Sequence, residues 1–127
     1  MHAELDQHLR ALAPALPAWF IVTAFNPHGR LQSMRCNRHA HARLSARLEN
    51  KVQNLVLPTC HRDPSGQWPD EPGWLVACSD PHDGVALARE FDQLAIVAGC
   101  QHRAAELWLC DGQWPATLPR HVRVAGS

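Results

Sequence analysis

Short apolar runs, separated by Gly, Pro, Asn and Asp, divide this chain into strands and helices. Apolar runs rich in β-branched and aromatic residues are typical of buried strands, and turn-forming residues mark their ends. The sequence therefore predicts five strands, at residues 19–25, 55–59, 74–78, 94–98 and 106–110.

Three further segments show the spacing of an amphipathic helix. The first is a short leucine-rich helix within residues 1–17, closed by prolines. The second runs from about Asn37 to Leu55, and its apolar stripe, extended backwards, places Asn37 in the first turn, facing inward. The third begins at Ser79-Asp80-Pro81, where a capping residue precedes a proline at the first helical position.

After the leading helix, the elements follow the order strand, helix, strand, strand, helix, strand, strand. The first six match the split arrangement of ferredoxin-like folds, in which the third strand lies between the first two and the fourth flanks the first. We therefore predict a single α+β domain, residues 1–127, with a ferredoxin-like sheet of about five strands and two main helices. Residues 1–17 form the N-terminal helix, 18–110 the core and 111–127 a tail.

Composition narrows the function classes. The chain has 127 residues, and its Lys plus Arg and Asp plus Glu balance at 12 each, whereas proteins that bind nucleic acid through phosphates usually carry a basic excess. No stretch approaches the roughly 20 apolar residues of a membrane span. The N-terminus shows no secretion signal pattern, and the five cysteines form no CxxC motif. These features predict a cytoplasmic protein with reduced thiols and argue against membrane and nucleic-acid partners.

The predicted topology gathers polar residues from separate segments at one edge of the sheet. These candidate ligand-binding residues are Thr23, Asn26, Asn37, Arg62, Asp63, Trp68, Glu71 and Gln93. Some of them also have a structural interpretation, because Asn26 shapes a turn before a proline, Asn37 is placed to cap a helix, and Asp63 opens a turn. Glu71 and Gln93 have no comparable explanation, so we keep a shared site as the working hypothesis.

The residue types in this set suit a small polar ligand. Asn and Gln side chains both donate and accept hydrogen bonds, as recognition of a base, an amide or a sugar requires. Glu71 is the candidate catalytic residue, as a general acid or base, while Trp68 offers a stacking surface and Arg62 a partner for an anionic group. The sequence therefore predicts a small-ligand pocket, leaves open whether it is catalytic, and points to no cofactor.

Two other classes of function stay open. The same fold suits a non-catalytic regulatory or protein-interaction module. Apolar residues of the tail, such as Trp114 and Val122, suit a self-association surface and a homodimer. The second alternative is a metal-binding protein, because thiols and imidazoles gather in two short segments: Cys36, His39, His41, Cys60 and His61. Zinc needs four converging ligands, and no HExxH motif is present.

Four motifs are spaced along the chain: Thr23-Ala24-Phe25-Asn26-Pro27, Asn37 opening a helix, residues 63–72 (DPSGQWPDEP) and residues 91–97 (FDQLAIV). Together they resemble a bacterial family, the domain of unknown function DUF3293. The resemblance covers about residues 19–109 and implies a small cytoplasmic protein without an established activity. It also implies which positions form the family's polar set: Thr23, Asn26, Asn37, Trp68, Glu71 and Gln93. The chain departs from the family at its start, where a leucine helix stands in place of an aromatic-rich extended segment.

Overall fold

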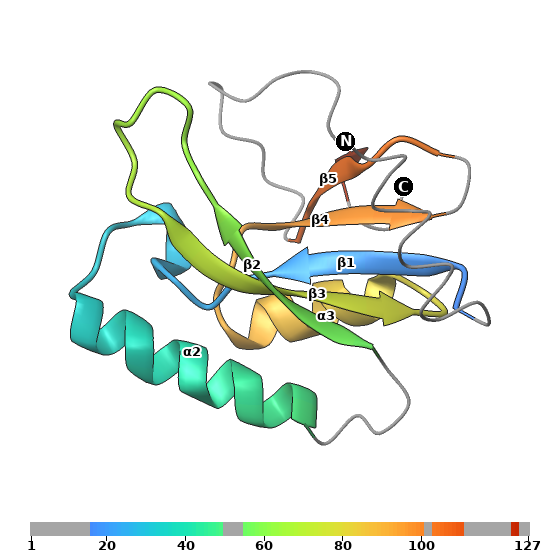
Figure 1. Ribbon diagram of the computed structural model, residues 1–127, viewed down its shortest axis with the longest axis horizontal. Coiled ribbons are helices and arrows are strands. Elements are labelled where there is room, and N and C mark those ends of the chain that lie inside the picture. The colour runs from blue at the N-terminus through green and yellow to red at the C-terminus, as the bar shows by residue number, and fades with distance from the viewer. Residues whose placement is uncertain (1–15, 50–54, 101–102, 111–122, 125–127) are drawn as a thin grey trace.

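The fold is a largely antiparallel sheet with two helices (Figure 1). The computed structural model describes residues 16–49, 55–100, 103–110 and 123–124. The strands are β1 (Ala18–Val22), β2 (Val56–His61), β3 (Glu71–Cys78), β4 (Ala95–Cys100), β5 (Glu106–Leu109) and β6 (Arg123–Val124), in the spatial order β2-β3-β1-β4-β5-β6. The helices are α2 (Met34–Glu49) and α3 (His82–Glu90), and a short 3-10 turn, η1 (Pro27–Gly29), precedes α2.

The centre of the sheet is β1, which pairs antiparallel with both β3 and β4. β2 pairs antiparallel with the outer side of β3, and β5 with β4, whereas β6 runs parallel to β5. The α+β class is therefore confirmed, and β1 to β5 have the neighbours expected from the sequence. Residues 1–15 of the predicted N-terminal helix, and residues 111–122 and 125–127 of the predicted tail, lie outside the described residues. None of the helices in the described part of the chain combines the length and apolar character that crossing a membrane requires.

Strand ends differ from the prediction where contacts between segments decide them. β1 ends at Val22 rather than at Phe25, because the Thr23 hydroxyl accepts a hydrogen bond from the Phe25 N–H at 3.1 Å and the chain turns there. β2 extends to His61, and β3 begins at Glu71, because these two residues pair across the strands. Glu71 therefore lies on a strand and not in the predicted loop.

The start of α2 also differs from the prediction. The helix begins at Met34 and not at Asn37, because Ser33 is its cap: the Ser33 hydroxyl accepts a hydrogen bond from the Cys36 N–H at 3.1 Å. Asn37 is buried in the first turn, as predicted, but its side chain does not cap the helix. The described part of the helix ends at Glu49, and residues 50–54 lie outside the described residues.

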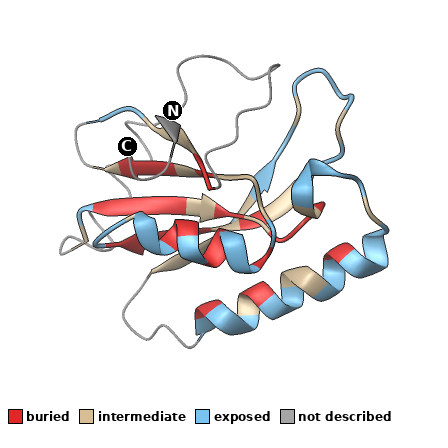
Figure 2. Ribbon diagram, turned by 180° about the vertical axis from the view of Figure 1, so that it is seen from behind, coloured by how far each residue is buried: buried red, intermediate tan, exposed pale blue. Residues whose placement is uncertain are grey.

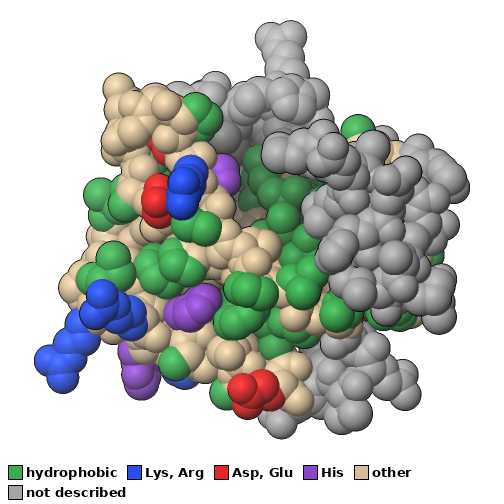
Figure 3. All heavy atoms as spheres, in the orientation of Figure 1, with side chains coloured by type: hydrophobic (Ala, Val, Ile, Leu, Met, Phe, Trp, Pro, Cys, Tyr) green, Lys and Arg blue, Asp and Glu red, His purple; other side chains and the backbone are tan. Residues whose placement is uncertain are grey.

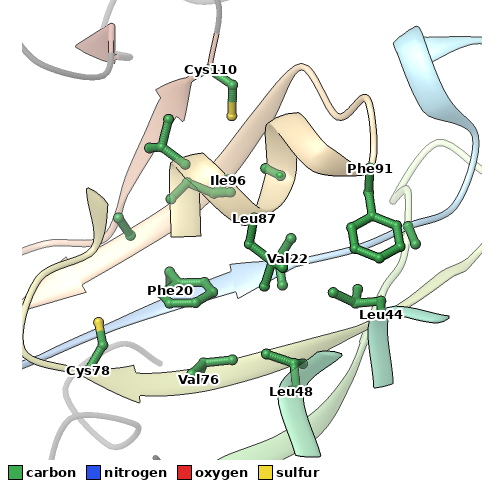
Figure 4. Packing of buried hydrophobic residues seen from close by; sticks show 14 of the residues in the cluster. Phe20, Val22, Leu44, Leu48, Val76, Cys78, Leu87, Phe91, Ile96 and Cys110 are labelled. Atoms are coloured by element: carbon green, nitrogen blue, oxygen red, sulfur yellow. The ribbon is translucent and has the colours of Figure 1, made fainter. Parts of the chain in front are cut away.

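Both helices contribute to one hydrophobic core on the same face of the sheet (Figures 2 and 4). Phe20 and Val22 of β1 pack there with Leu44 of α2 and Leu87 of α3. α3 approaches β1 closely, since a Cβ atom on Gly84 would lie only 2.5 Å from the Phe20 ring. Burying each large apolar side chain contributes roughly 1.5–3 kcal/mol, so this layer is the main source of stability.

The opposite face of the sheet is also apolar. Alternate residues of a strand point to opposite faces, so Trp19 and Ile21 lie on the side away from Phe20. Trp19 and Leu75 form a second buried cluster, against which Ile21 and Val97 pack. A Cβ atom on Gly99 of β4 would overlap the Trp19 ring, so this glycine gives the indole its place on the sheet. The sheet therefore carries hydrophobic side chains on both faces.

Candidate functional site

Two buried asparagines hold the chain together just beyond β1. The Asn26 N–H donates to Asn37 Oδ1 at 2.8 Å, and Asn37 Nδ2 donates back to Asn26 Oδ1 at 3.0 Å. Each residue is only 3% exposed. A buried amide group without a partner is costly, so this reciprocal pairing fixes the segment after β1 against the first turn of α2.

The backbone conformation of Asn26 explains why asparagine suits this position. Asn26 has φ 50° and ψ 61°, the left-handed region that asparagine tolerates better than most residues. In this conformation its N–H points to Asn37 and its side chain reaches a third residue, Gln32, whose N–H donates to Asn26 Oδ1 at 3.1 Å. The turn and the side-chain contacts therefore depend on one another.

Two more side chains extend the pair. Gln32 Nε2 donates to Asn37 Oδ1 at 2.7 Å, and Asn26 Nδ2 donates to Glu71 Oε1 at 2.9 Å. Gln32, Asn37, Asn26 and Glu71 thus form a continuous chain of hydrogen bonds, which we call the amide network. Sequence reasoning missed Gln32, because it lies in an irregular segment between η1 and α2 where no periodicity indicates an inward direction.

The side chains of Thr23 and Gln93 donate hydrogen bonds to backbone carbonyls in the same region. The Thr23 hydroxyl donates to the Pro72 carbonyl at 2.8 Å. Gln93 Nε2 donates to the carbonyls of Phe25, at 3.1 Å, and Phe91, at 3.3 Å. Five of the eight candidate residues therefore meet around the end of β1: Thr23, Asn26, Asn37, Glu71 and Gln93.

The remaining three candidates lie in the connection between β2 and β3, and no hydrogen bond among the described residues joins them to the amide network. Asp63 accepts hydrogen bonds from Ser65 and from the Trp68 N–H at 2.9 Å, all within this loop. The Ser65 hydroxyl and the backbone N–H groups hold the pKa of Asp63 below its usual value. Arg62 forms an exposed ion pair with Asp70 at 3.7 Å. The contacts of Asp63 and Arg62 therefore organise the loop itself.

A hollow of about 510 Å³ opens on the sheet face that carries Trp19. We call it the sheet-face pocket; Figure 3 shows hydrophobic side chains in a hollow on this face, beside acidic, basic and histidine side chains. Its lining residues lie on β1 to β5, apart from Thr23, which directly follows β1: Trp19, Ile21, Thr23, Thr59, Cys60, His61, Glu71, Gly73, Ala95, Ile96, Val97 and Leu107. Glu71 and Thr23 belong both to this pocket and to the convergent set, so the polar cluster is connected to a cavity.

The pairing of β2 with β3 places His61 in the lining of this pocket. It stands directly opposite Glu71 in the register of β2 and β3, and both residues line the pocket. Sequence reasoning considered His61 only as a metal ligand, because the pairing of His61 with Glu71 follows from the extended strand ends described above. The pocket therefore presents a carboxylate and an imidazole from neighbouring strands.

A second hollow, of about 450 Å³, lies beside α2. Gln32 lines it, together with Arg35, Cys36, His39 and Arg43 of the helix, Glu90 at the end of α3 and Asp92 just after it. The Arg43 guanidinium lies over the Phe91 ring, 5.2 Å from its centroid. Charges of both signs line this hollow, so it carries no clear preference for an anion or a cation.

The five metal-ligand candidates are divided among separate places. Cys36 and His39 line the hollow beside α2, whereas Cys60 and His61 line the sheet-face pocket. His41 stacks on the Trp74 ring, and burial lowers its pKa. Among the described residues, no three Cys, His, Asp or Glu side chains gather closely enough to hold a metal ion. The described part of the chain therefore contains no zinc site of the predicted kind.

Comparison with known protein families matches residues 22–96 to DUF3293, a family of proteins of unknown function. This segment contains all eight candidate residues, from Thr23 to Gln93. No curated protein and no solved structure matched the chain. Because the match spans more than half of the sequence and coincides with the elements that build the amide network, the chain belongs to the DUF3293 family.

Proposed function

We propose that this protein binds a small organic molecule in the sheet-face pocket. The observation that carries the proposal is the position of Glu71, which lines an apolar hollow while Asn26 holds its carboxylate at 2.9 Å. Small-molecule sites typically combine an apolar lining with a few oriented polar groups, in cavities of about 300–1,000 Å³. The volume of about 510 Å³ falls in this range.

The amide network supports this proposal because it fixes a polar group before any ligand arrives. A carboxylate on a flexible side chain loses rotamer freedom when it binds, which weakens affinity. Glu71 is held by Asn26, and Asn26 is held by Asn37 in the protein interior. A ligand that meets Glu71 therefore meets a group whose orientation is already set.

We further propose Glu71 as the residue that transfers a proton if the bound molecule is converted. A carboxylate acts as a general acid or base when it reaches the reacting group within hydrogen-bond distance. Glu71→Gln keeps an oxygen that accepts from Asn26 but removes the titrating group. We expect turnover to be lost in this variant while the melting temperature stays close to that of the wild type.

Blocking the pocket tests the binding function. Val97 lines the pocket from β4, so Val97→Trp places an indole in the hollow, whereas Ala86→Trp adds the same group to the exposed side of α3. Phenethyl alcohol is a suitable neutral probe, with ¹H–¹⁵N spectra as the readout. We expect shifts at Ile21, Val97 and Leu107 in the wild type and in Ala86→Trp, but not in Val97→Trp. Equal binding by all three folded proteins would contradict the proposal.

We also propose that the fold is ferredoxin-like, with β5 and β6 added at one edge. The order β2-β3-β1-β4 and the antiparallel pairing of these strands support this classification. A bacterial source and a cytoplasmic location are part of the same proposal. All five cysteines are free thiols, which supports a reducing compartment.

A further inference from the structure

We infer that the ligand of the sheet-face pocket carries a positively charged amine, which binds the Glu71 carboxylate, on an apolar body that covers β1 and β4. This inference rests on the proposed function, because it names the class of molecule that the same pocket takes. It comes from the charge of the lining and from the one oxygen of Glu71 that the amide network leaves available.

The charge of the pocket lining favours a cation. Glu71 is the one Asp or Glu among the described lining residues, and neither Lys nor Arg is among them. No basic side chain of the described residues forms an ion pair with Glu71. A ligand carboxylate or phosphate would meet a like charge here, whereas an ammonium group would complete an ion pair.

The geometry of the carboxylate leaves one oxygen for the ligand. Asn26 Nδ2 occupies Glu71 Oε1, and no donor among the described residues reaches Oε2. An ammonium group carries three hydrogens to donate and no acceptor, which suits an unpartnered carboxylate oxygen. His61, opposite Glu71 on β2, and the Thr23 hydroxyl stand at the same end of the pocket.

The floor of the pocket determines the rest of the ligand. Ile21 and Leu107 line it from β1 and β5, and Val97 lies between them on β4. These side chains offer no hydrogen bonds, so they favour an apolar or aromatic body over a sugar or a phosphate ester. The combined arrangement fits an arylalkylamine or a similar amphipathic amine.

Three matched probes test this inference: phenethylamine, phenethyl alcohol and phenylacetate share a phenyl ring and differ in the charge of the polar end. We would measure their dissociation constants by NMR titration at about pH 8, above the usual titration range of imidazole. Charge-assisted hydrogen bonds are stronger than neutral ones, so we expect phenethylamine to bind at least about ten-fold more tightly than phenethyl alcohol. Phenylacetate should bind more weakly than either.

Two variants test whether the preference for the amine comes from Glu71 itself or from the negative charge of neighbouring residues. Glu71→Gln keeps the contact with Asn26, and we expect it to abolish the preference for the amine. Asp70→Asn removes a neighbouring exposed carboxylate that does not line the pocket, and we expect the preference to survive. If phenethyl alcohol binds in the pocket but the wild type shows no preference for phenethylamine, or Glu71→Gln retains it, this inference is wrong and the proposed function stands. If none of the probes binds, both are wrong.

Discussion

Replacing Asn37 by leucine tests whether the amide network holds the fold together at the end of β1. Leucine has the same branching as asparagine and fills the space, so no cavity forms, but it provides neither an acceptor nor a donor. The variant removes the acceptor of the Asn26 N–H and the donor to Asn26 Oδ1. Gln32 Nε2 also loses its acceptor, but Gln32 is only partly buried and its amide can turn towards water.

The expected loss of stability depends on which polar groups stay buried without a hydrogen-bond partner. Asn26 is 3% exposed, so its unpaired N–H costs about 1–3 kcal/mol. Asn26 Oδ1 loses one donor but keeps the Gln32 N–H at 3.1 Å, which limits the additional loss to about 1 kcal/mol or less. We therefore expect Asn37→Leu to lower the free energy of unfolding by about 1–4 kcal/mol, a large share of the roughly 5–15 kcal/mol of a typical domain.

Urea denaturation measures this effect, with Gln32→Ala as the matched control. Gln32→Ala removes one hydrogen bond to Asn37 Oδ1, which still accepts the Asn26 N–H, so we expect a loss below about 1 kcal/mol. The slope with denaturant should stay unchanged in both variants. A loss in Asn37→Leu no larger than in Gln32→Ala would refute the argument that the buried Asn26 N–H depends on this side chain.

Three further predictions concern stability. Burial lowers the pKa of His41 below 6.5, so the folded state binds fewer protons than the unfolded chain; stability should be complete above about pH 6.5 and fall below it. His41→Phe, which keeps the stack on Trp74, should weaken this pH dependence in urea titrations, and an unchanged slope would exclude His41 as a cause. Gly84→Ala should lower the melting temperature, because overlap with the Phe20 ring costs about 1–3 kcal/mol and exceeds the gain of about 1 kcal/mol in helix propensity. A higher melting temperature would show that the helix shifts freely away from the ring. Leu44→Ala, at a fully buried position, should cost about 2–5 kcal/mol by denaturation, and a loss below 1 kcal/mol would contradict the assigned core.

The positions of the strands could be predicted, because their apolar runs do not depend on distant contacts. The residues at which the strands end could not be predicted, because contacts with distant segments decide them. Pro72 made residues 71–73 look like a loop, since proline cannot donate a hydrogen bond in the middle of a sheet. In the structure, β1 pairs with β3 only as far as Trp74, so β3 has a strand partner on one side alone at Pro72. Just beyond the end of β1, the Thr23 hydroxyl donates to the Pro72 carbonyl, a contact between residues far apart in sequence.

The candidate site was predictable to the extent that topology determines it. Asn37 was found because it continues the inward stripe of a helix, and Glu71 because the predicted strand order brings its segment to the end of β1. Gln32 was missed because irregular backbone gives no direction to a side chain. His61 was not connected with Glu71 because that relation exists only through the register of two strands.

A crystal structure of the protein with phenethylamine tests most directly whether the sheet-face pocket binds an amine through Glu71. We expect the amine nitrogen within hydrogen-bond distance of the Glu71 carboxylate and the ring against Ile21 and Val97, with the contact between Asn26 and Glu71 intact. Binding in the hollow beside α2, or binding in the sheet-face pocket with the amine turned away from Glu71, would contradict it.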